Sequence, residues 1–311
     1  MRTDTRTYLT DKFSLEDMEK IERIINSIEI NEKKILISYV ELTRHISELD
    51  KLFNIFRCNL TNLFSNFIIY PDDYIEKCTG IYSEDQCYYQ INALIINLIS
   101  SAKTFIESIE VCMKNFLSEK DFKLFKQKFL SKPYDEVFSY RFLLHMRNYS
   151  QHGHLPLNIR NKRVYFDLND ILDMPHFDLN KLLKEEIKKL KVDIYNEFGT
   201  LPYISYVYTI SRFNLVVTEI YVNFLNEIKA KLVKFNQQKN ELLNDKKFYF
   251  INPDGTENDM IFYDYDGEVH HCFNYQANSM AMYAEFKKEA KKFLKVKENY
   301  FTELHKKLPA S

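Results

Sequence analysis

The chain has 311 residues, of which 45% are apolar, and its 43 basic and 44 acidic side chains leave a net charge of −1. This apolar fraction is enough for a packed core and excludes a disordered chain. The balanced charge excludes a global attraction to polyanions, so any nucleic-acid contact must depend on a local patch. Only five Gly and seven Pro are present, too few for the turns of a many-stranded β fold, and this scarcity predicts long helices.

Cysteine use and hydropathy predict a cytoplasmic protein without membrane contact. The five cysteines are odd in number and form no C-x-x-C pair, which favours reduced thiols over a disulfide framework or a zinc site. Residues 1–12 are polar and lack the apolar segment of a signal peptide. The most apolar stretch, 91–109, is interrupted by polar and charged residues, so we expect a buried helix there and no membrane span.

The N-terminal part is predicted to be helical. A capping box at residues 14–17 opens a helix that runs to about residue 28. Apolar side chains at steps of three and four from residue 32 to about 68 predict a long amphipathic helix. Its apolar face can pack internally, which we favour, or contact a coiled-coil-like partner. Residues 70–86, which contain proline, glycine and two acidic pairs, are predicted to form a loop.

Three helices are predicted in the middle of the chain. They cover residues 88–116, 121–130 and 135–152. Pro133 is expected to end the second helix, and Gly153 is expected to stop the third. A small β-hairpin then follows, with strands at 157–160 and 163–168 flanking Asn161-Lys162.

The C-terminal part combines helices with a second β element. Two Asp-Gly turns divide residues 247–273 into three short apolar segments, which predicts a β-meander. Amphipathic patterns predict further helices at 179–198, 206–244 and 279–307. The predicted fold class is therefore mostly α.

Arg147 and His152 form an R-x4-H pattern near the end of the helix predicted at 135–152. Ten Arg and eight His in this length give, by chance, roughly one such pair in every four chains, so the pair alone is weak. The context strengthens it. Asn148 follows the arginine, and Gly153 and Pro156 follow the histidine.

The segments Phe138–Phe142, Met146–His152 and Leu155-Pro156 resemble the HEPN superfamily. The motif of that family is Arg, a polar residue, three further residues and His, and Arg147, Asn148 and His152 match it. The resemblance covers residues 84–154. One position departs from some toxins of the family, because His154 stands where they carry a tyrosine that an antitoxin modifies.

The resemblance implies a HEPN-like helical bundle. We expect a single elongated helical domain over residues 1–311 with a HEPN-like core at about 84–168. Residues 1–70 would form N-terminal helices, and residues 169–311 a helical extension that carries the β-meander. Either flanking part could gate the site.

The motif residues suit metal-independent cleavage of RNA. His152 has the pKa range for proton transfer, and the guanidinium of Arg147 can hold phosphate oxygens. Asn148 lies four residues from His152 on one helical face and can orient the imidazole, whereas Arg147 lies about 140° away. One copy supplies one histidine, so acid and base together predict a homodimer through the motif helices, the arrangement that the family also implies.

Four further residues are candidates for substrate binding. They are Lys103, Arg141, Tyr149 and His154. Tyr149 can stack on a base, although its spacing fits core packing equally well. Lys103 can equally be a surface side chain, and His154, like His145, a capping or surface histidine.

No metal or cofactor is expected. His270-His271-Cys272 holds metal-ligand residue types, but neighbouring residues of a strand point to opposite faces. Residues 264–268 have the wrong spacing for a calcium loop. The lysine-rich run at 287–297 alternates with glutamates, so it can be an RNA contact or a solvated helix face.

Two functions follow from this interpretation. The first is an endoribonuclease in a bacterial toxin or in anti-phage defence, with RNA as substrate and an antitoxin or another regulatory protein as a candidate partner. The alternative is a non-catalytic HEPN-like protein that binds RNA or nucleotides or acts as an oligomeric scaffold. The motif residues can also have a purely structural role, in which His152 interacts with the helix dipole and Arg147 forms a salt bridge.

Overall fold

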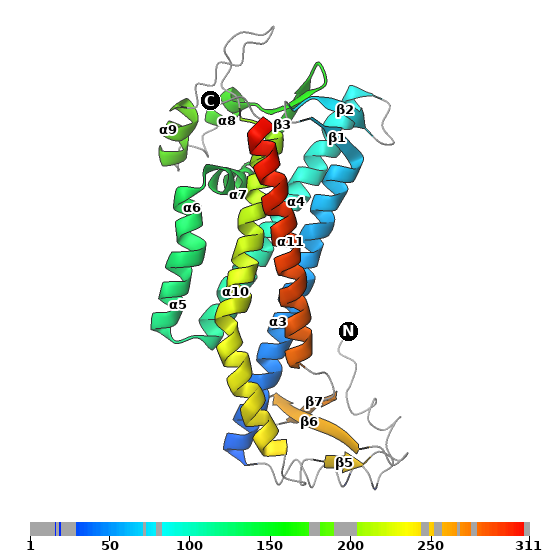
Figure 1. Cartoon of the computed structure of the whole chain (residues 1–311), viewed down its shortest axis with the longest axis vertical. Helices are drawn as coiled ribbons and strands as arrows, with labels where there is room; N and C mark the ends of the chain where they lie inside the picture. The colour runs from blue at the N-terminus through cyan, green and yellow to red at the C-terminus, as the bar shows by residue number, and fades with distance from the viewer. Residues whose placement is uncertain are drawn as a thin grey trace. The chain divides into compact units, whose positions relative to one another are not determined.

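The computed structural model in Figure 1 describes residues 16, 19, 29–70, 73–78, 83–173, 181–189, 204–243, 249–251, 257–265, 268–274 and 279–307. The chain divides into two compact units. One comprises residues 1–47 and 225–287, and the other residues 48–224 and 288–311. None of the described helices combines the length and the hydropathy that a membrane crossing requires.

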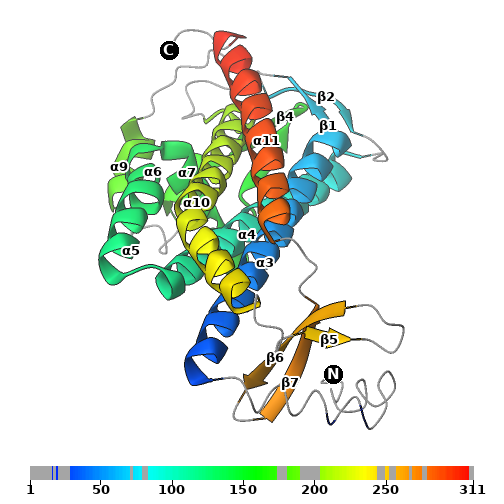
Figure 2. The same ribbon diagram turned by 60° about the horizontal axis from the view of Figure 1, so that its bottom comes forward.

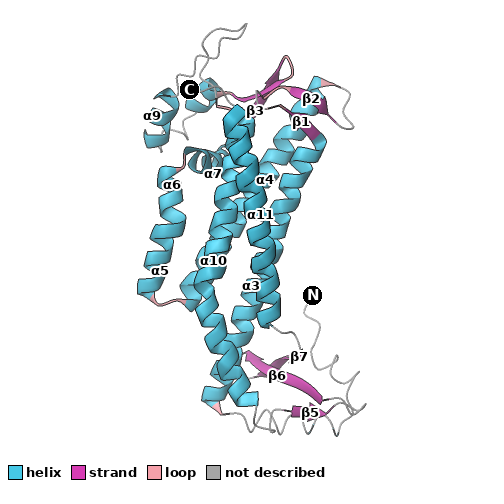
Figure 3. Cartoon of the chain, in the orientation of Figure 1, coloured by secondary structure: helices cyan, strands magenta, loops and turns pink. Residues whose placement is uncertain are grey.

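Helices dominate the described residues, as predicted, and three small antiparallel sheets accompany them (Figure 3). The helices are α3 (Ile30–Asn66), α4 (Glu84–Phe116), α5 (Glu119–Phe125), η1 (Lys126–Ser131), α6 (Lys132–Glu136), α7 (Phe138–Gln151), α8 (Leu168–Asp173), α9 (Lys181–Lys189), α10 (Tyr206–Leu243) and α11 (Ser279–Lys307). The sheets pair β1 (Phe67–Ile69) with β2 (Ile75–Cys78), β3 (Leu157–Arg160) with β4 (Arg163–Phe166), and β5 (Tyr249–Ile251) with β6 (Glu257–Tyr265) and β7 (Glu268–Asn274).

Several predicted elements are confirmed. The helices α10 and α11 match their predicted ranges almost residue for residue. The hairpin of β3 and β4 turns at Asn161 and Lys162, whose φ angles of 51° and 62° lie in the left-handed region that two-residue hairpins use. The meander of β5, β6 and β7 is antiparallel in the predicted order.

The loop predicted at 70–86 was wrong, because this segment contains β2 and the start of α4. The N-cap of α4 is Ser83, whose hydroxyl accepts from the backbone N–H of Gln86 at 3.2 Å. The helix predicted to reach residue 68 ends at Asn66 and continues as β1. These strands bury one residue each, Phe67 and Ile75, so their sequences carry too little periodicity to be recognised.

The prediction for Pro133 was also wrong. It lies near the start of α6, directly after a π-helical segment, and does not end the helical path. The π-helical segment η1 joins α5 to α6 without a break. The short helix α8 was not predicted.

Two predicted helices are only partly covered by the described residues. The one at 14–28 lies outside them, apart from the helical residues Glu16 and Glu19. The one at 179–198 is described only over α9.

In the larger unit, the rings of four helices meet in one aromatic cluster. Phe53 of α3 lies 5.5 Å from Phe105 of α4, 4.4 Å from Tyr221 of α10 and 6.0 Å from Phe293 of α11, measured between ring centroids. These four helices run side by side in Figures 1 and 2. Burial of these large rings supplies the hydrophobic stabilisation that holds the helices together.

Asp73 connects the first sheet to α10 in the same unit. It is fully buried, with a φ of 64°, and its carboxylate accepts from the backbone N–H groups of Tyr206 and Val207, both at 2.9 Å. Its backbone oxygen accepts from the N–H of Val164 at 3.0 Å. A residue distant in sequence therefore caps the N-terminus of α10.

The smaller unit has its own core. Leu36, Tyr39 and Val40 of α3 pack with Phe235 and Leu242 of α10. The hydroxyl of Tyr39 also donates to Oγ of Ser279 at 2.6 Å, which links α3 to the start of α11 within this unit.

Candidate functional site

The helix α7 presents the R-x4-H motif on its last turn. Val137 precedes the helix without a side-chain cap, so packing and not capping holds α7 in place. Its buried residues contact α4 and α6, and the ring of Phe142 meets that of Phe166 edge-on at 4.9 Å. The motif is thus carried by a helix with one firmly packed face.

The predicted stop of α7 is confirmed at its end. His152 is the C-cap, and its backbone N–H donates to the oxygens of Asn148 and Tyr149 at 3.3 and 3.2 Å. Gly153 follows with a φ of +86°, and its N–H donates to the oxygen of Ser150 at 3.1 Å. Glycine at this position ends the helix in a left-handed conformation.

Gly153→Ala is expected to lower the free energy of unfolding by about 1 kcal/mol. The space around Gly153 is open, so the cost comes only from the positive φ. Gly153→Asn is expected to cost less, because Asn tolerates this conformation. Urea unfolding measures both, and equal destabilisation by the two variants would contradict the conformational explanation.

The three motif residues differ in exposure. The side chains of Asn148 and His152 are exposed on the same side of α7, whereas that of Arg147 is half-buried. Nη1 of Arg147 donates to Oε1 of Gln151 at 3.2 Å, and its buried Nε has no hydrogen-bond partner among the described residues. The end of α7 therefore exposes an imidazole and an amide to solvent and carries a half-buried guanidinium in the same part of the helix.

Tyr149 and His154 lie together beside the motif. Their ring centroids are 5.0 Å apart. Burial, followed by the carboxylates of Asp170 and Asp167, raises the pKa of Tyr149 to about 12. This phenol therefore stays neutral, next to the acidic start of α8.

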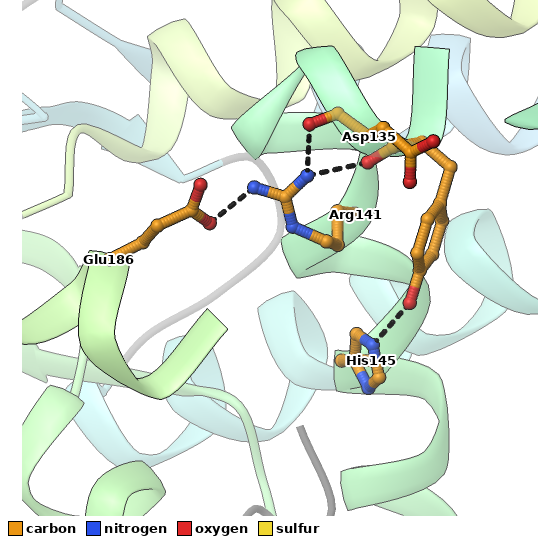
Figure 4. Close-up of polar contacts among 5 residues, drawn as sticks. Asp135, Arg141, His145 and Glu186 are labelled. Atoms are coloured by element: carbon orange, nitrogen blue, oxygen red, sulfur yellow. Dashed lines mark hydrogen bonds and ion pairs between the residues drawn. The ribbon is translucent and has the colours of Figure 1, made fainter. Parts of the chain in front are cut away.

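Arg141 is held inside the protein. It is 2% exposed, and its Nη1 donates to the backbone oxygens of Tyr134 and Asp135 at 2.6 and 2.7 Å. Nη2 forms an ion pair with Glu186 of α9, and Figure 4 shows the guanidinium between this carboxylate and Asp135. These partners indicate a structural role for Arg141, which links α9 to α7.

Glu186→Ala is expected to lower the free energy of unfolding by about 1–2 kcal/mol, because it leaves a buried guanidinium without its counter-charge. The loss stays below that of a fully buried pair, since Glu186 is 34% exposed and Arg141 keeps two backbone acceptors. Glu185→Ala is the matched control. Glu185 is an exposed neighbour that pairs with Lys188 at 3.3 Å, so its loss should cost under about 0.5 kcal/mol. Urea unfolding compares the two, and equal effects would refute the prediction.

His145 lies on the same side of α7 as Asn148 and His152. The four residues Arg141, His145, Asn148 and His152 are spaced by four, three and four, which places them within about 60° around the helix. Nε2 of His145 is 2.7 Å from the hydroxyl of Tyr134 (Figure 4). Burial lowers the pKa of His145, and the charges of Lys103 and Arg141 lower it further.

The predicted site residues therefore form two groups. Arg147, Asn148 and His152 lie on the last turn of α7, with Tyr149 and His154 beside them. Lys103 of α4 and Arg141 of α7 instead lie near His145, which is closer to the N-terminus of α7 than the motif is. Nζ of Lys103 is 3.9 Å from Oε1 of Glu107. The partners Tyr134 and Glu186 were missed, because a hydroxyl and a carboxylate distant in sequence leave no pattern to recognise.

The other sequence candidates can be placed only in part. His270-His271-Cys272 falls in β7, and the predicted turns at 254–255 and 266–267 lie outside the described residues. Among the described residues, no three His, Cys, Asp or Glu side chains are grouped as metal ligands would be. In the lysine-rich run of α11, Nζ of Lys297 lies 5.0 Å from the ring centroid of Phe293, whereas Lys288, Lys291, Lys292 and Lys295 are exposed.

Comparisons of this chain with protein-family models, with curated proteins and with solved structures find no match.

Proposed function

We propose that this protein is a metal-independent endoribonuclease of HEPN type that acts as a homodimer. The observation that carries the proposal is the exposure of His152 and Asn148 on one side of the last turn of α7, with Arg147 in the same turn. A toxin or anti-phage role, as the family resemblance implies, is part of the proposal.

The proposed reaction divides the chemistry among these side chains. The 2′-oxygen of a ribose attacks the adjacent phosphorus, and the bond from phosphorus to the 5′-oxygen breaks. One imidazole accepts the proton of the 2′-hydroxyl, and another donates a proton to the leaving 5′-oxygen. The guanidinium of Arg147 stabilises the charge on the non-bridging oxygens, and Asn148 orients the ring of His152. The products are a 2′,3′-cyclic phosphate and a 5′-hydroxyl.

The second imidazole is assigned to another copy of the chain. Within one chain, His145 is the other histidine on this side of α7, and its Cα lies about 10.5 Å from that of His152 along the helix axis. His145 is also engaged with Tyr134 at 2.7 Å. A partner's His152, brought in by pairing of the two α7 ends, meets the requirement for an acid and a base at one phosphate.

The acidic side of the motif suggests where the RNA backbone runs. Asp167 and Asp170 are close enough to Tyr149 to raise its pKa, and their carboxylates would repel phosphate. The RNA phosphates are therefore expected to run on the side of Asn148 and His152. Tyr149 is expected to pack inside the protein and not to bind RNA.

Cleavage of mixed RNA in EDTA tests the proposal. The wild type is expected to produce RNA fragments whose terminal phosphate is removed by phosphomonoesterase only after acid has opened the cyclic phosphate. Arg147→Ala is expected to cleave at least about 100-fold more slowly. RNA binding by a wild type that never cleaves would favour a binding module instead. Equal cleavage by wild type and Arg147→Ala would refute the assignment of the motif.

A further inference from the structure

Two cysteines of the larger unit are in direct contact. Cys78 is the last residue of β2, and Cys87 lies in the first turn of α4. Their sulfur atoms are 2.9 Å apart, with the thiol of Cys87 donating to Sγ of Cys78. Both side chains are only partly buried, so a small reagent in solution can reach them.

The other cysteines with described side chains lie in different surroundings. Cys58 is exposed on α3, and Cys112 is buried in α4. No hydrogen bond joins either of these two to another described cysteine. Among the described cysteines, Cys78 and Cys87 are thus the two whose thiols are in contact with each other.

We propose that Cys78 and Cys87 form a redox pair that closes to an intramolecular disulfide under mild oxidation, which ties the end of β2 to the first turn of α4. Disulfide formation needs two sulfurs brought within bonding reach, and here folding already does this. The bond closes a loop of about ten residues, so only a short stretch of chain is constrained.

The reaction is a two-step exchange with a small disulfide as oxidant. The thiolate of one cysteine attacks a sulfur of the oxidant and expels one thiolate, which leaves a mixed disulfide on the protein. The second cysteine then attacks that mixed disulfide and expels the other thiolate. Two protein thiols are oxidised, one small disulfide is reduced to two thiols, and the protons of the protein thiols pass to the released thiolates or to solvent.

The order of attack follows from the surroundings of the two thiols. Burial is the largest cause that raises the pKa of Cys78 to about 12, and the neighbouring Cys87 contributes to the same shift. A thiol held in its protonated form is a poor nucleophile. Cys87 is therefore assigned the first attack and Cys78 the resolving step.

The bond would act on a turn that lies close to the motif helix. Tyr88 follows Cys87 in sequence and lies close enough to Tyr149 of α7 that its ionisation would raise the pKa of Tyr149. Asn92, one turn later, donates to the backbone oxygen of Leu157 at 2.9 Å and accepts from its N–H at 3.0 Å. A covalent tie at Cys87 would thus fix the part of α4 that supports the end of α7 and the β3–β4 hairpin.

The test treats the full-length native protein with oxidised glutathione, blocks the remaining thiols with iodoacetamide and maps the peptides by mass spectrometry. The expected product is one peptide pair that joins Cys78 to Cys87, with the loss of two hydrogens and no glutathione retained. Cys78→Ser is expected to stop at a stable glutathione adduct on Cys87. Cys58→Ser is the matched control and should leave the internal disulfide unchanged.

Each outcome decides the proposal without reference to RNA cleavage. Glutathione adducts on both cysteines of the wild type, a disulfide to another cysteine or between two chains, or recovery of both as free thiols would each overturn it. The wild-type peptide map alone is sufficient if a serine variant fails to fold. Protein unfolded in urea before oxidation serves as reference, and an equal rate of disulfide formation there would show that the folded contact has no role.

Discussion

Replacing His152 by alanine is expected to reduce the rate of RNA cleavage by about 10²–10⁴-fold, the usual contribution of a positioned acid or base. The side chain lies exposed at the C-cap of α7, and the hydrogen bonds that close this helix end come from its backbone. The free energy of unfolding should therefore change by less than about 1 kcal/mol, which is the usual contribution of a charged histidine near a helix C-terminus. Initial rates with labelled RNA in EDTA and urea unfolding measure the two effects separately.

His305→Ala is the matched control for this variant, because His305 is also an exposed histidine near a helix C-terminus. It should cleave RNA at the rate of the wild type. A loss of activity in both variants would point to a general effect of surface charge, and retained activity in His152→Ala would refute the catalytic assignment.

A mixing experiment separates a composite site from one that is complete in a single chain. Wild type at fixed concentration is equilibrated with a ninefold excess of His152→Ala until subunits exchange. By mass action, its activity should fall about tenfold, because most wild-type chains then pair with a variant that lacks the second imidazole. Unchanged activity would show that one chain suffices.

Replacing Asp73 by alanine is expected to lower the free energy of unfolding by about 3–5 kcal/mol. The fully buried carboxylate accepts from the backbone N–H groups of Tyr206 and Val207, and from Oγ of Ser205 at 3.3 Å. Alanine leaves these donors buried without an acceptor and must also adopt a φ of 64°. Urea unfolding gives the total loss, and hydrogen exchange at Tyr206 and Val207 reports on the first turn of α10 directly.

Two further variants divide this loss into its causes. Asp73→Gly removes the acceptors but adopts the positive φ freely, so it should be less destabilising than alanine by about 1 kcal/mol. Asp73→Asn keeps one acceptor oxygen and tolerates the left-handed region, so it should retain roughly half of the stability that alanine loses. A cost under 1 kcal/mol for Asp73→Ala would show that α10 does not need this cap.

The elements that could be predicted from sequence are those with a strong local signal. The helices α10 and α11 repeat their apolar residues over many turns, and the β3–β4 hairpin is marked by Asn161-Lys162 between two short apolar strands. Hydrophobic periodicity and turn chemistry act over a few residues, so they are visible in one chain.

The elements that were missed depend on partners distant in sequence. The strand β2 is extended because it pairs with β1 and because the N–H of Ile75 donates to the oxygen of Lys162 at 2.7 Å. Pro133 by itself predicts the end of a helix, but the π-helical segment η1 before it continues directly into α6.

The motif divides in the same way between local and tertiary information. Local sequence determined that Arg147, Asn148 and His152 share the last turn of a helix, that Gly153 ends it, and that Asn148 and His152 lie on one face, because helix geometry and a left-handed glycine need no distant partner. Only the tertiary structure decided that Arg141 is buried against Glu186, that His145 is engaged by Tyr134, and that Cys78 meets Cys87. The physical reason is that burial, charge pairing and thiol contact are set by packing between segments, on which the order of residues along one helix has no direct influence.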